Sequence, residues 1–166
     1  MNALWAYFWP IFAAGLMIGG IAGLIGFRRR GNRAMTLTIG IAAALASAAL
    51  WHWPLGAAGR FTAHVERTAR QALDYYEMTK VTAHLHRRPL TRMLVLSGPA
   101  DDFQTSELVR LMSQLPGVSR ARWTDQAGGA PLLVEAAGVS LAAFLLGLLL
   151  AYLIDLRRRY NAQWTW

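Results

Sequence analysis

The chain has no cysteine and few acidic residues, with nine Asp and Glu against seventeen Lys and Arg in 166 residues. The lack of cysteine excludes disulfides and thiolate metal sites. Charged residues make up only 16% of the chain, and they are gathered in short clusters. A soluble protein of this size spreads its charges along amphipathic faces, so this composition argues against that class.

Three long apolar runs bracket one polar segment: Leu4–Phe27, Ala34–Pro54 and Pro131–Leu156. Each run is long enough to cross a bilayer, which takes about 20 residues. The first run has no basic residue before it, so we expect it to be retained and not cleaved as a signal peptide. The expected organisation is a transmembrane hairpin in 1–56 (spans about 4–27 and 34–54), an extramembrane domain in 57–130, a third transmembrane helix in 131–156 and a tail in 157–166.

Seven of the basic residues lie directly beside the apolar runs: Arg28, Arg29, Arg30, Arg33, Arg157, Arg158 and Arg159. Short loops rich in Lys and Arg stay in the cytoplasm. We therefore expect a multi-pass protein of the bacterial inner membrane, with a cytoplasmic carboxyl terminus. The amino terminus and residues 57–130 then face the periplasm.

Tryptophan and small residues predict how the helices sit and pack. Trp5, Trp9, Trp51 and Trp53 fall at one expected interface, and Trp164 and Trp166 lie beyond the other, as in aromatic belts that contact lipid or a partner. Small residues recur every four positions in the first two spans, and such rows allow close helix packing. We expect a tight hairpin of these two spans through Gly15, Gly19, Gly23, Gly40, Ala44 and Ala48. The third span is rich in leucine (Leu145, Leu146, Leu148, Leu149 and Leu150), which suits lipid or a partner helix.

The polar segment predicts five elements in the order helix, strand, strand, helix, strand. The expected ranges are 61–78, 81–85, 93–97, 103–115 and 118–124, from periodicity and from the Pro and Gly between them. The first helix would bury Phe61, Val65, Ala69, Ala72, Leu73 and Tyr76, and the second would bury Phe103, Leu108, Leu111, Met112 and Leu115. Asp101 and Asp102 offer N-cap oxygens for the second helix.

Three short sequences in this segment resemble a known family. Val95-Leu96-Ser97-Gly98 ends the second strand, Asp101-Asp102 starts the helix, and Leu115-Pro116-Gly117-Val118 leads to the last strand. This order and these motifs resemble the BON domain (bacterial outer-membrane and nodulation domain) over residues 61–125. The chain departs from the family pattern at His86–Arg92, where the family more often has an Asn-Gly turn. The resemblance implies a periplasmic, non-catalytic module that contacts phospholipid or neighbouring envelope proteins.

The ionisable residues do not form a recognisable catalytic or metal-binding pattern. Glu135, Asp155 and His52 lie near the ends of the expected spans, where structural roles are expected. His84 and His86 would share a strand face, but two histidines need further ligands to hold a metal. No phosphate-binding loop, nucleophile elbow or zinc-protease motif occurs. We expect no enzyme activity, no cofactor and no nucleic-acid binding.

A basic strip of Lys80, Arg87, Arg88 and Arg92 is the remaining surface feature, and it could attract phosphate headgroups or be a solvated turn. Two functions stay open. The first is a non-catalytic accessory, scaffolding or assembly subunit of a larger inner-membrane complex, for example respiratory or photosynthetic, with other integral membrane proteins as partners. The second is a free-standing envelope protein whose BON-like domain binds phospholipid.

Overall fold

The computed structural model describes residues 2–28, 32–123 and 128–162. The protein is mostly helical, with one small three-stranded sheet. It divides into two compact units. The first combines the residues up to Tyr7 with Gly56–Glu135, and the second combines Phe8–Leu55 with the residues from Ala136 onward. The first unit thus reaches past residue 130, the expected end of the extramembrane domain.

Three of the described helices are long and apolar enough to cross a membrane: α1 (Ala3–Arg28), α2 (Arg33–His52) and α5 (Leu132–Ala162). They indicate a multi-pass membrane protein. Helix α5 does not stop at residue 156 but continues through the three arginines that follow. At 1.5 Å per residue, its 31 residues extend about 46 Å, well beyond a hydrocarbon core of about 30 Å.

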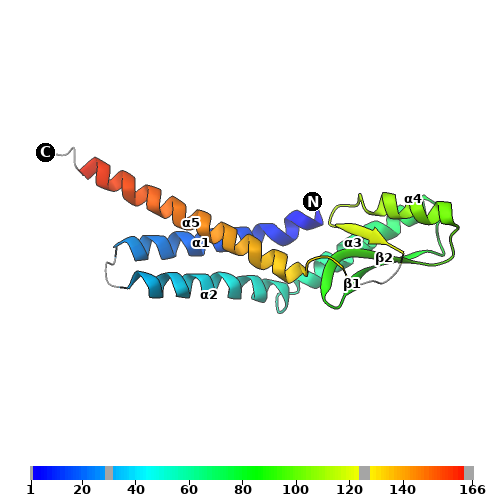
Figure 1. Ribbon diagram of the computed structural model, residues 1–166, viewed down its shortest axis with the longest axis horizontal. Helices are drawn as coiled ribbons and strands as arrows, with labels where there is room; N and C mark the ends of the chain where they lie inside the picture. The colour runs from blue at the N-terminus through cyan, green and yellow to red at the C-terminus, as the bar shows by residue number, and fades with distance from the viewer. Residues whose placement is uncertain (1, 29–31, 124–127, 163–166) are drawn as a thin grey trace. The chain divides into compact units, whose positions relative to one another are not determined.

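The polar segment forms the five expected elements in the expected order. They are α3 (Ala57–Tyr75), β1 (Thr82–Arg87), β2 (Leu90–Ser97), α4 (Asp102–Met112) and β3 (Arg120–Arg122), of which the first four are labelled in Figure 1. Helix α3 begins earlier than expected, and β2 begins three residues earlier, at Leu90. The boundaries differ because backbone pairing, and not side-chain periodicity alone, decides where an element starts.

The sheet has the order β1-β2-β3, with β1 antiparallel and β3 parallel to the central strand. Ala83 pairs with Leu96, and Leu94 pairs with Ala121, so these apolar side chains share one face. Helix α3 packs on β1, and α4 packs on β3. The buried core between helices and sheet is formed by Phe61, Val65, Ala69, Leu73, Val81, Ala83, Leu85, Leu94, Leu96, Leu108, Met112 and Ala121.

Side chains from the two helices satisfy backbone groups on the outer edges of the sheet. The Leu85 amide of β1 donates to Glu66 Oε1 of α3 at 3.0 Å. The Ala121 amide of β3 donates to Ser113 Oγ, just after α4, at 2.9 Å. Unpaired edge groups invite pairing with another chain, so these two bonds protect the edge strands and hold the helices in register with them.

The motifs quoted for the family resemblance have clear local roles. Asp101 is the N-cap of α4: its carboxylate accepts from the Gln104 amide at 2.7 Å, and the Gln104 side chain accepts from the Asp101 amide. Gly117 has φ +101, which an L side chain rarely adopts. A Cβ at Gly98 would lie 2.6 Å from the Lys80 carbonyl oxygen, so the β2–α4 turn passes close to the loop before β1.

Two residues expected in the core are exposed instead. Phe103 in the first turn of α4 is 74% exposed, and Tyr76 just after α3 is 44% exposed. Phe103 lies in the first turn of its helix and Tyr76 lies just after the last turn of its own. Helical periodicity identifies the side of a helix that faces the core, but it does not show how far along the helix the core extends.

Candidate functional site

The glycine row of α1 packs against α5. A Cβ at Gly15 would lie 2.5 Å from the Ser140 carbonyl oxygen, and one at Gly19 would overlap the Phe144 backbone. At Gly23 the neighbour would be the Ala151 methyl, at 2.6 Å. Helices α1 and α5 therefore touch backbone to backbone, and Figure 1 shows them crossing. Any side chain larger than hydrogen at Gly19 would force them apart.

The small residues of α2 also face α5. A Cβ at Gly40 would lie 2.8 Å from the Phe144 ring, and the Ser140 hydroxyl donates to the Ala44 carbonyl oxygen at 2.8 Å. Ala48 is fully buried, and Ala22 of α1 closes the cluster around Phe144. The α1 row thus packs on α5, whereas the α2 row contacts both α5 and Ala22 of α1, so α5 takes part in packing that was expected within the α1–α2 hairpin alone.

The third span carries a row of small residues that was not among the expected packing residues: Ser140, Ala143, Gly147 and Ala151. All four are buried, and a Cβ at Gly147 would lie 2.7 Å from the Gly20 amide nitrogen. Their spacing of three and four residues was the available signal. The leucines around this row obscure its pattern in the sequence, because they make the whole span appear bulky.

The leucines themselves mostly point outward. Leu145, Leu146, Leu149 and Leu150 are between 41% and 64% exposed, whereas Leu148 packs against the Phe144 cluster. Exposed leucines on a membrane span face lipid or a partner's helix. One face of α5 thus packs against α1 and α2, and the leucine-rich face is exposed.

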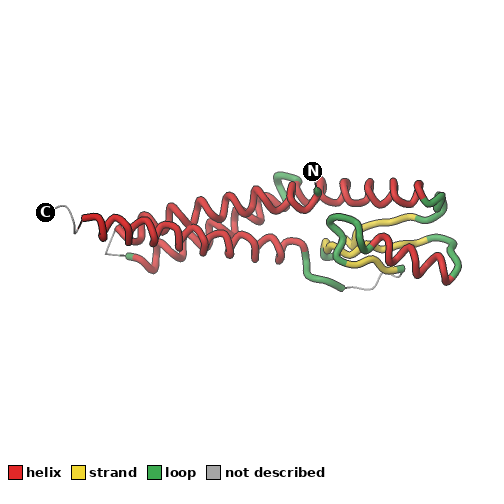
Figure 2. Tube along the Cα trace, turned by 90° about the horizontal axis from the view of Figure 1, so that it is seen from above, coloured by secondary structure: helices red, strands yellow, loops and turns green. Residues whose placement is uncertain are grey.

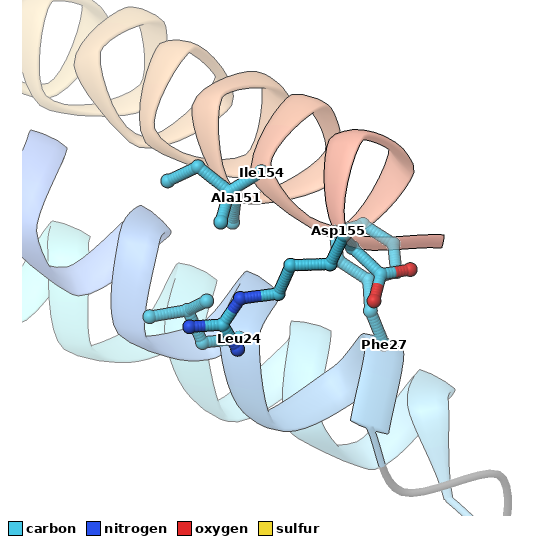
Figure 3. A pocket seen from close by; sticks show the side chains of 6 residues that line it. Leu24, Phe27, Ala151, Ile154 and Asp155 are labelled. Atoms are coloured by element: carbon cyan, nitrogen blue, oxygen red, sulfur yellow. The ribbon is translucent and has the colours of Figure 1, made fainter. Parts of the chain in front are cut away.

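A small pocket lies between α1 and α5 near the end of the bundle (Figure 3). Leu24 and Phe27 line it from α1, and Ala151, Ile154, Asp155 and Arg158 line it from α5. Its volume of about 10 Å³ has room for about one water molecule, so it is no ligand site. Asp155 Oδ2 lies 2.7 Å from Arg159 Nη2, one turn further along α5.

The expected basic strip is not continuous. Arg87 lies 3.3 Å from Glu66, and Arg92 Nε lies 2.8 Å from Glu135 Oε2, so two of its four cations have carboxylate partners. Lys80 precedes β1 and Arg88 follows it, which places them about 20 Å apart along the strand. The strip therefore provides no cluster of four positive charges on one surface.

The structure describes four of the six tryptophans that were expected at membrane interfaces. Trp5, Trp9 and Trp53 are more than half exposed, and Trp51 is partly buried. The His52 ring lies 5.6 Å from the Trp53 ring, edge to face, and is buried near the end of α2. Trp164 and Trp166 lie outside the described residues.

No group of three or more His, Asp or Glu side chains that could hold a metal occurs within the described residues. His84 Nδ1 lies 3.8 Å from Glu66 Oε1, and a β-bulge separates His84 from the pairing of Arg87. Glu135 Oε2 lies within ion-pair distance of Arg92 Nε, but the two atoms are not aligned for a hydrogen bond. The ionisable groups singled out from the sequence thus take part mainly in local contacts.

One end of the extramembrane unit has a feature that periodicity did not predict. The end of α3 and the start of α4 lie at the same end of the sheet in both views (Figures 1 and 2). Tyr75 is 81% exposed there, its ring 5.2 Å from that of Tyr76, and Phe103 is the third exposed ring. We call Tyr75, Tyr76 and Phe103 the aromatic end.

Comparison with known proteins found no match for this chain among protein-family models, curated proteins or solved structures.

Proposed function

We propose that the protein is a non-catalytic accessory, scaffolding or assembly subunit of a larger bacterial inner-membrane complex. Its three apolar helices anchor it, and residues 57–130 form a BON-like domain on the periplasmic side. The order of the five elements, the Asp101 cap and the positive φ of Gly117 support the BON-like assignment. The arginines beside the spans support the orientation.

The observation that carries the proposal is the aromatic end. Its three large rings are exposed on a domain whose other large apolar side chains are mostly buried. Exposed aromatic rings in a water-facing domain mark protein contact surfaces, where Tyr and Trp dominate binding energy. Helix α3 is 19 residues long, so this end lies about 28 Å along the helix from Gly56, where the chain enters the domain.

The open face of α5 provides a second contact surface. Its exposed leucines give a bulky apolar row beside the face that packs on α1 and α2. A partner helix can dock on such a row inside the bilayer, while the aromatic end contacts the same complex outside it. Two separate contact surfaces on a small chain suit a subunit that holds other subunits together.

The decisive experiment is affinity purification of the tagged full-length chain from its native membranes in mild detergent, followed by native gels and mass spectrometry. The test variant is Tyr75→Ser, Tyr76→Ser, Phe103→Ser, and the control is His64→Ser, Arg67→Ser on the exposed face of α3. We expect partners in fixed stoichiometry with the wild type and the control, and their loss with the test variant. A wild-type chain recovered alone would contradict the proposal.

The second candidate is a free-standing envelope protein whose BON-like domain binds phospholipid, for which the basic strip would supply the positive charge. Because Arg87 and Arg92 are paired with carboxylates and Lys80 lies at the other end of β1, the strip supports it weakly. The purification separates the two functions: recovery with lipid but without protein partners would favour the second.

A further inference from the structure

The face of the sheet opposite the buried Leu94 and Ala121 carries a pocket of about 310 Å³ that none of the functions above uses. Met93 of β2 forms part of its lining, together with Ser119, Arg120 and Arg122 on and beside β3. The chain leading into α5 closes the other side, with Gly128, Gly129, Ala130 and Glu135. This volume falls at the lower end of the range for small-molecule sites.

The strand register explains why two arginines face this pocket together. Arg120 pairs with Met93, and Arg122 pairs with Val95, on the face opposite buried Leu94 and Ala121. Residues two apart on a strand point the same way, with Cα atoms about 7 Å apart. The two guanidinium groups are therefore neighbours by backbone geometry.

The charges around the pocket do not balance. Glu135 is the lining carboxylate, and Arg92 Nε already lies 2.8 Å from it. Among the described residues, Arg120 and Arg122 make no ion pair or side-chain hydrogen bond, unlike Arg87 and Arg110. Because Arg92 neutralises Glu135, the described residues that line the pocket leave two positive charges, those of Arg120 and Arg122.

We propose that this pocket binds a phosphate group, with Arg120 and Arg122 as its ligands. A phosphate monoester carries nearly two negative charges, and guanidinium groups bind its oxygens in bidentate pairs. A single carboxylate would leave one arginine uncompensated. The Ser119 hydroxyl donates to the Arg92 carbonyl oxygen at 3.1 Å, so it positions the start of β3 and the arginines supply the recognition. This proposal does not rest on the accessory-subunit function.

The test uses the full-length chain in phosphate-free micelles, with inorganic phosphate and glycerol 3-phosphate as probes and chloride at equal ionic strength as the reference. Binding is measured by calorimetry and by the shift in unfolding temperature. The test variant is Arg120→Gln, Arg122→Gln. Arg67→Gln is the control, because it removes an exposed positive charge of the same unit away from the pocket. Circular dichroism without probe verifies that each variant folds.

We expect both probes to bind the wild type and the control, with affinity at least about tenfold weaker in the double variant, a loss of about 1.4 kcal/mol. Equal binding by the double variant, or no binding of either probe to the wild type, would overturn the proposal. A second arm identifies the source of the phosphate. Competition by nanodiscs that contain phosphatidic acid, a lipid with a phosphate monoester headgroup, supports a lipid headgroup at this pocket, and the absence of competition supports a soluble phosphate ester.

Discussion

Gly19 of α1 lies directly against the backbone of Phe144 in α5. A Cβ at Gly19 would overlap the Phe144 carbonyl oxygen and come within 2.9 Å of its Cα. The adjacent Gly20 has open space where its Cβ would be. Two neighbouring glycines on one helix therefore have opposite roles, and the difference depends entirely on which side α5 occupies.

This contrast gives a matched pair of variants. Gly19→Ala should lower the free energy of unfolding by about 1–3 kcal/mol, because backbone atoms cannot move aside as a flexible side chain can. Gly20→Ala should leave it unchanged or raise it by about 0.5–1 kcal/mol, since alanine favours a helix. Unfolding in mixed micelles measures both. Equal effects of the two substitutions would show that α1 does not pack on α5 through Gly19.

A second pair tests the contact of α2 with α5. The hydroxyls of Ser140 and Ser47 both donate to the Ala44 carbonyl oxygen, at 2.8 and 2.7 Å. Only the Ser140 bond joins two helices. Ser140→Ala should destabilise the bundle by about 0.6 kcal/mol, a typical value for such bonds within membranes, and Ser47→Ala should have almost no effect. The comparison uses the same micellar unfolding assay, and a larger loss with Ser47→Ala would count against the interhelical bond.

The ion pair between Arg92 and Glu135 should give a measurable coupling energy in the stability of the protein. The two side chains are only 24% and 25% exposed, so solvent screens them less than a surface pair. A double-mutant cycle with Arg92→Gln and Glu135→Gln should give a coupling of about 0.5–3 kcal/mol. The exposed pair Arg110 and Glu107 serves as the control and should give about 0.5 kcal/mol or less. Indistinguishable couplings would mean that the Arg92 pair is fully solvated.

The N-cap of α4 can be tested at two adjacent aspartates. Asp101→Ala removes the oxygen that accepts from the Gln104 amide and should cost about 1 kcal/mol of stability. Asp102→Ala removes a first-turn charge without removing the cap and should cost less, about 0.3–1 kcal/mol at low salt. Urea unfolding monitored by circular dichroism would show which substitution costs more stability, and high salt should reduce the Asp102 effect by a larger fraction than the Asp101 effect. The reverse order would place the cap at Asp102.

Much of the architecture could be predicted because it depends on local rules. The three apolar runs, the five-element order of the polar segment and the cap at Asp101 follow from hydropathy, periodicity and backbone propensity. The exposed rings of Tyr76 and Phe103 could not be predicted this way, because burial depends on whether another element reaches that end of the helix. The pocket depends on register, which brings Arg120 beside Met93 from a distant part of the sequence.

By itself, the sequence determined which segments are apolar enough to span a membrane and which small residues allow close packing, since both are properties of one helix. Only the tertiary structure decided which helix each small face meets. The sequence of α1 allows Gly19 to face either α2 or α5. In the structure it faces Phe144, because the small residues of α5 lie opposite the glycines of α1 along the two helices. Close packing requires two complementary surfaces, and complementarity is a property of the pair, so no single helix can specify it.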